Sequence, residues 1–349
     1  MYSQKIINSI QFLRGFAALA VVIHHTGGYV KRYYEPYLLM GDYFGIGFAG
    51  VDLFFVISGF IIHFTSKNYL NNPSKLTEYL KKRFVRVFPI FWLITIFLFL
   101  SGWVMKFVFK MDFFSIGYPH TLKAYLETFT LFPLHFAINP VTWTLSYELF
   151  FYLCFSLLII SKYLWFIPIG ILLISFYNIF IVHSGIDLNY YNFVFSGYNF
   201  EFMLGYLICQ FYDKIQLPNW AMFLLLSVAI SVVLYFGYDV SDVDSYQRIL
   251  IFGVPSGMIL FSLLHLEKNG FIKFHHIWIE MGNASYALYL IHFPMMLLMN
   301  KIPRIVGYYF NAQQEIIYSY FIIICIVFTS IYVHKWIEKP LSKLILSKI

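Results

Sequence analysis

An apolar stretch near the start of the sequence carries two residues that could do chemistry together. Arg14 and His25 flank "RGFAALAVVIHH", with ten residues between them. On an α-helix they would lie about 16 Å apart on nearly the same face, whereas His24 would point about 100° away. The spacing predicts an anion-binding guanidinium at one end of a helix. At the other end it predicts a base suited to proton transfer near neutral pH.

Three further ionisable residues interrupt other apolar runs. Asp52 lies in "GFAGVDLFFVISGFII", Glu148 in "TWTLSYELFFY" and His292 in "NASYALYLIHFP". An ionisable group inside a membrane span costs several kcal/mol and is a functional-site candidate. If both termini are cytoplasmic, these three residues and His25 fall in the outer half of the membrane. We therefore expect one shared cavity, in which Glu148 or Asp52 orients His25.

A basic cluster precedes another apolar run. In "KKRFVRVFP", Arg83 and Arg86 are three residues apart and would share a helix face. Guanidinium groups bind phosphate in a bidentate manner, and Arg14 would lie near the same inner boundary. The three arginines are therefore predicted to clamp a phosphate-rich ligand.

Each of these residues also has a simpler interpretation. Arg83 and Arg86 could belong to the positive charge that marks a cytoplasmic loop. Arg14 could extend toward lipid headgroups, and Asp52 could be no more than the cap of a helix. Glu148 is harder to explain in this way, because a carboxylate one turn into an apolar helix requires a partner.

Composition places these residues in a membrane protein. The chain has 349 residues, 60% of them hydrophobic and 12% charged, about half the charged fraction of a soluble domain. We predict an all-α integral membrane protein with a single domain over 1–349 and no appended soluble domain. Ten spans are expected, at approximately 10–30, 49–66, 89–109, 143–162, 164–183, 196–212, 219–237, 247–265, 283–300 and 316–336.

The distribution of charge sets the expected orientation. Lys and Arg are more numerous on the side of the two termini, which predicts that both termini are cytoplasmic. The net charge of +7 then belongs mostly to cytoplasmic loops, so it does not require a nucleic-acid partner. No metal site is predicted.

Six segments in order resemble the motifs of the membrane acyltransferase-3 family. They are "IQFLRGFAALAVVIHH", "GFAGVDLFFVISGFII", "RFVRVFPIFW", "TWTLSYELFFY", "SYALYLIHFP" and "WIEKPL", which together reach from Ile10 to Leu341. The family includes O-antigen and peptidoglycan O-acetylases and an exopolysaccharide-production branch. Its arginine–ten residues–histidine motif matches Arg14 and His25. Where the family commonly has serine, this chain has Thr144, which keeps a hydroxyl.

The resemblance implies an O-acyltransferase of the bacterial inner membrane that moves an acetyl group from acetyl-CoA to a glycan or lipid-linked sugar. Acetyl-CoA phosphates would bind Arg83, Arg86 and Arg14. His25 would deprotonate a sugar hydroxyl, or would itself be acylated and pass the group on. Trp143, Tyr147 and His292 are predicted to contact the acceptor.

Two points stay open at the level of sequence. A polytopic transporter or flippase for a glycolipid is the alternative, because buried histidines and carboxylates also form proton relays. The absence of a visible repeat argues modestly against it. Acceptor specificity is assigned to the outer loops, Tyr29 to Phe48 and Lys110 to Pro140, whose sequences carry no readable code.

Overall fold

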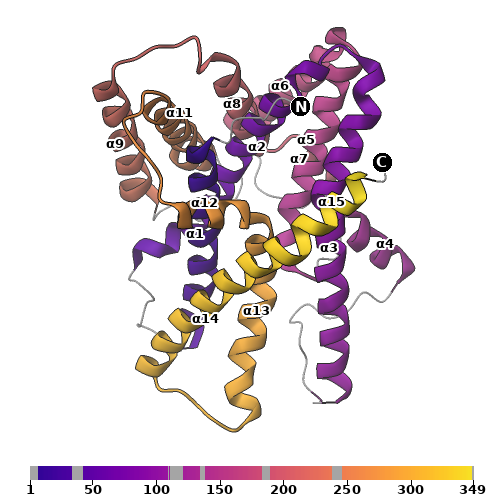
Figure 1. The fold of residues 1–349 in the computed structure, drawn as a ribbon, viewed down its shortest axis with the longest axis vertical. Helices are drawn as coiled ribbons and strands as arrows, with labels where there is room; N and C mark the ends of the chain where they lie inside the picture. The colour runs from indigo at the N-terminus through magenta and orange to yellow at the C-terminus, as the bar shows by residue number, and fades with distance from the viewer. Residues whose placement is uncertain are drawn as a thin grey trace. The chain divides into compact units, whose positions relative to one another are not determined.

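The computed structural model describes residues 7–33, 42–108, 110, 121–133, 138–182, 189–237 and 246–347. All regular elements of these residues are helices (Figure 1). The α-helices are α1 (Asn8–Tyr33), α2 (Gly50–Ser66), α3 (Leu76–Phe107), α4 (Leu122–Thr130), α5 (Trp143–Ile160), α6 (Phe166–Phe176), α7 (Tyr190–Val194), α8 (Tyr198–Phe211), α9 (Asn219–Phe236), α10 (Tyr246–Arg248), α11 (Val254–Lys268), α12 (His276–Asn283), α13 (Ser285–Ile305), α14 (Ala312–Val333) and α15 (Lys339–Ser347). The predicted all-α class is confirmed.

Seven helical segments of the described residues are long and apolar enough to cross a membrane. They are Gly45–Tyr69, Pro73–Phe107, Pro140–Ile160, Lys162–Val182, Asn219–Phe236, Tyr246–Lys268 and Gln313–Ser347. The other three predicted spans coincide with α1, α8 and α13. α8 has only 14 residues, and α1 contains an arginine and two histidines that lower its mean hydropathy. The chain is a multi-pass membrane protein, whereas ten spans and cytoplasmic termini stay predictions.

The chain forms two compact units that exchange segments along the sequence. The first unit comprises Met1–Ala20, Ile46–Tyr79 and Phe150–Asn283, and the second comprises Val21–Gly45, Leu80–Leu149 and Ala284–Ile349. α1 therefore contributes its first half to one unit and its second half to the other.

An apolar core in the first unit fixes the start of α1. Leu13 and Ala17 pack with Val56 and Phe60 of α2 and with Leu260 of α11, and all five side chains are buried. The amino end of α1 is capped from α11. The Glu267 carboxylate accepts hydrogen bonds from the backbone N–H groups of Asn8 and Ser9, at 2.9 and 2.8 Å. A carboxylate at this position satisfies free N–H donors and complements the helix dipole.

Close backbone contact joins α2 to α8 in the same unit. A Cβ atom at Gly59 would overlap the carbonyl oxygen of Phe202, and one at Gly205 would overlap the carbonyl oxygen of Val56. Small residues on both sides let two helices approach when no water is present to drive apolar association. This contact holds the middle of α2, around Val56 and Gly59, beside α8.

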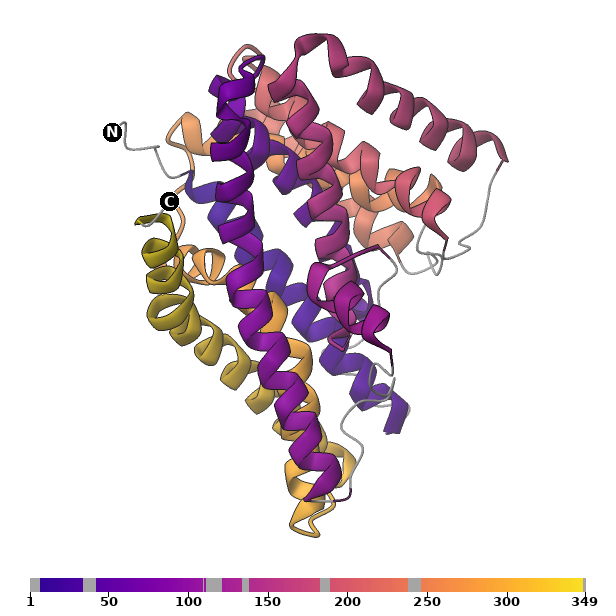
Figure 2. The ribbon, with the colours of Figure 1, turned by 90° about the vertical axis from the view of Figure 1, so that its right-hand side faces the viewer.

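The second unit is built on α3, α13 and α14. α3 runs as one long helix through Pro89 (Figure 2). α13 packs along α14, and the Tyr318 hydroxyl of α14 donates to the carbonyl of Met299, at 2.8 Å. That carbonyl lies four residues before Pro303, which has no N–H to offer it. The tyrosine thus restores a hydrogen bond that the helix lacks.

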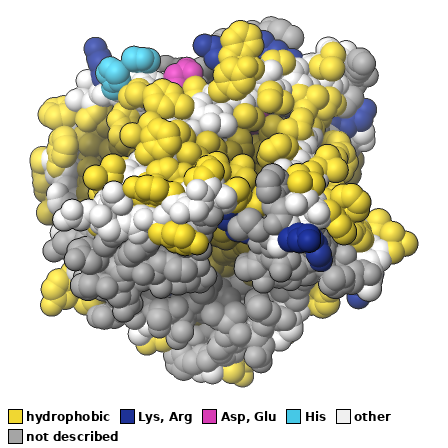
Figure 3. Space-filling view, turned by 90° about the horizontal axis from the view of Figure 1, so that it is seen from below, with side chains coloured by type: hydrophobic (Ala, Val, Ile, Leu, Met, Phe, Trp, Pro, Cys, Tyr) yellow, Lys and Arg dark blue, Asp and Glu magenta, His cyan; other side chains and the backbone are white. Residues whose placement is uncertain are grey.

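Large apolar side chains lie on the surface of several helices. Among the described residues in the view of Figure 3, hydrophobic side chains are far more extensive than charged ones. Examples of exposed residues are Phe97 and Trp103 on α3, Leu173 on α6, and Phe328 on α14. An apolar exterior of this kind is expected where helices face lipid.

Candidate active site

Two histidines meet in the second unit. His25 of α1 and His292 of α13 lie with Nδ1 and Nε2 3.0 Å apart, and their rings are stacked with centroids 5.1 Å apart. His292 is fully buried, whereas His25 is only partly buried. The sequence predicts one cavity for these two residues, and the structure brings them into direct contact.

The histidine pair continues into a polar cluster on α13 and α5. His292 Nδ1 lies 2.7 Å from the carbonyl oxygen of Tyr289. The Tyr289 hydroxyl accepts a hydrogen bond from Thr144 Oγ1 at 3.0 Å. Glu148, one turn along α5, interacts electrostatically with Tyr289.

A proline shapes this part of α13. Pro294 cannot donate to the carbonyl of Leu290, four residues before it. Asn139 fills the gap, because its side-chain Nδ2 donates to the Leu290 oxygen at 2.9 Å. Asn139 is buried and directly precedes the short 3₁₀ helix η4 (Pro140–Thr142), which leads into α5. The motif proline therefore ties the His292 region of α13 to the start of α5.

His24 has a separate anchor. Its Nδ1 donates to the carbonyl of Gly45, at 2.7 Å. Although His24 adjoins His25 in sequence, its hydrogen bond leads toward the 3₁₀ helix η1 (Asp42–Ala49). The two histidines therefore have different partners, as their positions around α1 predict.

Asp52 forms a buried ion pair in the first unit. Arg248 donates from Nε and Nη2 to the two carboxylate oxygens of Asp52, at 2.8 and 2.9 Å. The guanidinium also lies over the rings of Phe48 and Tyr198, and it interacts electrostatically with Glu201. Asp52 lies in the first turn of α2, and Ala49 is the capping residue. Both oxygens of the Asp52 carboxylate therefore bind Arg248.

Arg248 is a buried charge that sequence reasoning did not single out. It lies inside the predicted span 247–265, and an arginine inside an apolar run is the same signal that singles out Asp52. Counting the positive charges of each loop places Arg248 in an outer loop, and this count gives no reason to expect its ion pair with Asp52.

The predicted phosphate ligands lie on two helices. Arg83 and Arg86 are on α3 in the second unit, and Arg14 is on α1 in the first unit, 3.3 Å from the Gln11 side chain. Arg86 Nη1 donates to Glu338 Oε1 at 3.1 Å, and its guanidinium stacks over the Tyr286 ring. The Arg86 side chain is 35% exposed, which leaves one face of this ion pair open.

Glu338 is a second residue that sequence reasoning did not single out, although it belongs to the family segment "WIEKPL". His334 Nδ1 lies 2.8 Å from its other carboxylate oxygen, across the π-helical turn η9 (His334–Glu338). The carboxylate is thus shared by one arginine and one histidine.

Comparison with known proteins agrees with the motifs. Residues 7–336 match the family described as "Acyltransferase domain". The chain belongs to the acyltransferase-3 family. The family membership that the six motifs indicate is confirmed, and the protein is an acyltransferase.

Three relatives of this acyltransferase carry informative names. The "Exopolysaccharide production protein ExoZ" of Rhizobium meliloti is 28% identical over 72% of this chain and 77% of its own length. The "O-acetyltransferase OatA" of Staphylococcus aureus is 26% identical over 98% of this chain, which spans 58% of the length of OatA. A "Putative acetyltransferase ORF330" of Acidianus two-tailed virus is 25% identical over 84% of each chain. No solved structure matches the chain.

The predicted acceptor residues differ in their exposure. Trp143 is the first residue of α5 and is partly exposed, whereas Tyr147 is buried against it, with ring centroids 5.9 Å apart. Of the two loops to which specificity is assigned, 34–41, 111–120 and 134–137 lie outside the described residues. Trp143 is therefore the more accessible of the two aromatic candidates in the acyltransferase.

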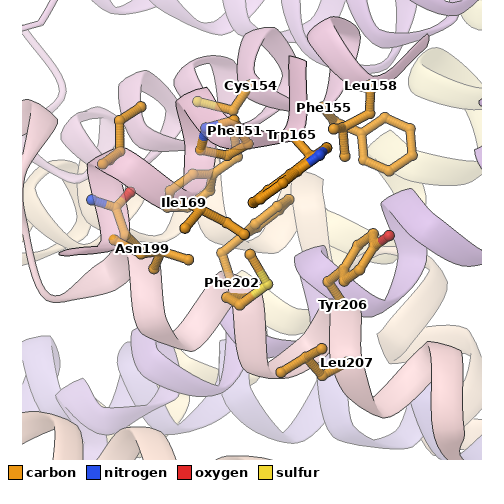
Figure 4. Close-up of a pocket in the computed structure, with 14 residues that line it drawn as sticks. Phe151, Cys154, Phe155, Leu158, Trp165, Ile169, Asn199, Phe202, Tyr206 and Leu207 are labelled. Atoms are coloured by element: carbon orange, nitrogen blue, oxygen red, sulfur yellow. The ribbon is translucent and has the colours of Figure 1, made fainter. Parts of the chain in front are cut away.

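An apolar cavity of about 260 Å³ lies in the first unit, between α5, α6 and α8 (Figure 4). Phe151 and Phe202 stack in its wall with centroids 4.3 Å apart, and Trp165 and Ile169 line it as well. Asn199 also lines the cavity, and its side-chain amide donates to Ser175 and to the carbonyl of Val194. Within the described residues, no group of three or more His, Cys, Asp or Glu side chains is arranged to hold a metal ion.

Proposed function

We propose that this acyltransferase is a membrane O-acetyltransferase that moves an acetyl group from acetyl-CoA to a hydroxyl of a cell-surface or lipid-linked glycan. The observation that carries the proposal is the His25 ring of the family motif, held against His292 and partly exposed. The name of OatA supports O-acetyl transfer, and the name of ExoZ supports a polysaccharide acceptor. We place the protein in the bacterial inner membrane.

The reaction exchanges a thioester for an oxygen ester. His25 takes the proton of the acceptor hydroxyl as its oxygen attacks the acetyl carbonyl carbon. The carbon–sulfur bond then breaks, and the CoA thiolate leaves with the proton that His25 had taken. In a two-step route, His25 attacks the acetyl carbonyl carbon and the carbon–sulfur bond breaks, which releases the CoA thiolate. The acceptor oxygen then attacks the acetyl group, the bond from its carbon to the His25 nitrogen breaks, and the hydroxyl proton goes to the thiolate. Both routes require a ring nitrogen of His25 that carries no proton.

Donor binding is assigned to the three arginines. The diphosphate and ribose phosphate of acetyl-CoA carry the charge that guanidinium groups bind best. Arg86 suits this role because its side chain is partly exposed, so a phosphate can approach it beside Glu338. Arg83 is one turn away on the same helix, and Arg14 is the third proposed ligand.

Acceptor binding is assigned to the start of α5. Trp143 presents an indole ring beside Tyr147, and aromatic faces of this kind stack on sugar rings. Glu148 lies on the same helix and interacts with Tyr289 of the polar cluster. We propose that the glycan hydroxyl approaches His25 from this side of the second unit.

Transfer of radiolabelled acetyl tests the proposal directly. The purified protein is reconstituted in nanodiscs with [¹⁴C]acetyl-CoA and glycans extracted from the producing cells. We expect label in the glycan with wild-type protein and at least about 100-fold less with His25→Ala. Mass spectrometry of surface glycans with and without the gene should show the matching loss of acetyl groups. A wild-type protein that transfers no label, while it moves a glycolipid across vesicles, would establish the transporter instead.

A further inference from the structure

The hydrogen bonds of the two histidines form a chain that ends at a backbone carbonyl. His25 Nδ1 meets His292 Nε2 at 3.0 Å, and His292 Nδ1 meets the carbonyl oxygen of Tyr289 at 2.7 Å. A carbonyl oxygen can only accept, so the proton of this last bond must be on His292 Nδ1. The position of this proton therefore determines which atom donates in the hydrogen bond between the two histidines.

The tautomer of His25 follows from the proton on His292 Nδ1. His292 is completely buried beside a second imidazole, an environment that disfavours a cation. In neutral His292 with its proton on Nδ1, Nε2 is an acceptor. His25 must then donate from its own Nδ1, and a neutral imidazole has only one proton to place.

We propose that His292 is a positioning residue that holds His25 with its proton on Nδ1 and its Nε2 free to act as the base. This inference rests on the proposed acetyl transfer for its catalytic meaning. When Nε2 of His25 takes the acceptor proton, the resulting imidazolium keeps its Nδ1–H bond to His292 Nε2. A neutral imidazole thus takes the place that a buried carboxylate occupies in many hydrolases, without burying a negative charge.

His292 is itself held by the surrounding helices. Its carbonyl partner lies on Tyr289, whose hydroxyl accepts from Thr144 and donates to the carbonyl of Val141. Asn139 binds the carbonyl of the next residue, Leu290. The turn of α13 just before His292 is therefore tied to the start of α5 by two residues. These contacts help the His292 ring to keep a single orientation.

Three substitutions of His292 test whether its role is to accept a hydrogen bond from His25 or only to fill space. In His292→Gln, the side-chain amide reaches the place of Nε2, and its oxygen can accept from His25 Nδ1–H. In His292→Asn, the amide reaches only the place of Nδ1. In His292→Phe, the ring shape remains without any acceptor. We expect kcat to stay within about 10-fold of wild type in the Gln variant and to fall about 100-fold or more in the other two. The KM for acetyl-CoA should change little in all three.

Nitrogen-15 NMR gives a readout that does not depend on activity. The protein is labelled at its histidines and reconstituted in nanodiscs, and the signal that disappears in His25→Ala is assigned to His25. We expect a protonated Nδ1 and an unprotonated Nε2 for His25 in wild type and in His292→Gln. His292→Phe should give a mixture of both tautomers.

The outcomes distinguish this inference from the function on which it rests. A protonated Nε2 on neutral His25 in the wild-type protein would overturn the inference, whatever the activity. Unchanged kcat in a folded His292→Phe protein would also overturn it, while acetyl transfer stood. If the wild-type protein transferred no acetyl group and His25 still carried its proton on Nδ1, the proposed function would fail and the hydrogen-bond assignment would hold.

Discussion

Two polar pairs, one in each unit, use their polar atoms in different ways. In the Asp52–Arg248 pair, two parallel hydrogen bonds occupy both carboxylate oxygens, and the side chains are 0% and 6% exposed. In the His25–His292 pair, one hydrogen bond joins two rings, and one of the rings is partly exposed. A closed pair can stabilise a fold, whereas a pair with an accessible ring nitrogen can also exchange a proton.

Removal of the accessible ring should have the largest effect. We expect His25→Ala to lower acetyl transfer by about 10²–10⁴-fold, because the general base is lost, while the amount of folded protein stays the same. His24→Ala is the matched control, since His24 binds Gly45 and should change transfer only a few-fold. Both rates come from labelled acetyl incorporation into glycans at equal protein. Equal losses in the two variants would show that the partners of the two histidines do not decide their roles.

Removal of one member of the closed pair should act on stability. Arg248→Met leaves the Asp52 carboxylate buried without its partner, and we expect the free energy of unfolding to fall by about 3–5 kcal/mol. The double variant Arg248→Met with Asp52→Leu should recover part of that loss, because no charge is then left behind at the pair. Thermal unfolding in detergent measures both. If the double variant is no more stable than the single one, the unpaired Asp52 carboxylate is not the cause of the lost stability.

A third ion pair, Arg86 with Glu338, lies between these two cases and should show the smallest effect. The Glu338 side chain is only 6% exposed, but Arg86 is 35% exposed and His334 still binds Glu338 after Arg86 is removed, so Arg86→Ala should cost less stability than Arg248→Met. It should raise the apparent KM for acetyl-CoA more than it lowers kcat, by about 1.5–3 kcal/mol of lost phosphate binding. Lys81→Ala, an exposed cation on the same helix, should leave KM unchanged. Calorimetry that finds equal acetyl-CoA affinity in wild type and Arg86→Ala would place the phosphates elsewhere.

Much of the helical framework could be predicted from sequence. Apolar runs of about 20 residues must form helices in lipid, and seven of the predicted spans coincide with helices of sufficient length and hydropathy. The motifs around Arg14, His25 and His292 are also enough to indicate the family. The division into two units could not be predicted, because it depends on which helices pack together and not on where hydropathy falls.

Sequence alone identifies the residues that are expensive to bury, because the cost of an ionisable group in an apolar run is a property of that run. It therefore singles out His25, Asp52, Glu148 and His292. Their partners are set by the packing of the helices. Asp52 pairs with Arg248, 196 residues away, and His25 pairs with His292, 267 residues away. Such choices depend on the rotation and height of helices that are remote in sequence. A difference of one residue turns a side chain by about 100°, so no local pattern encodes them.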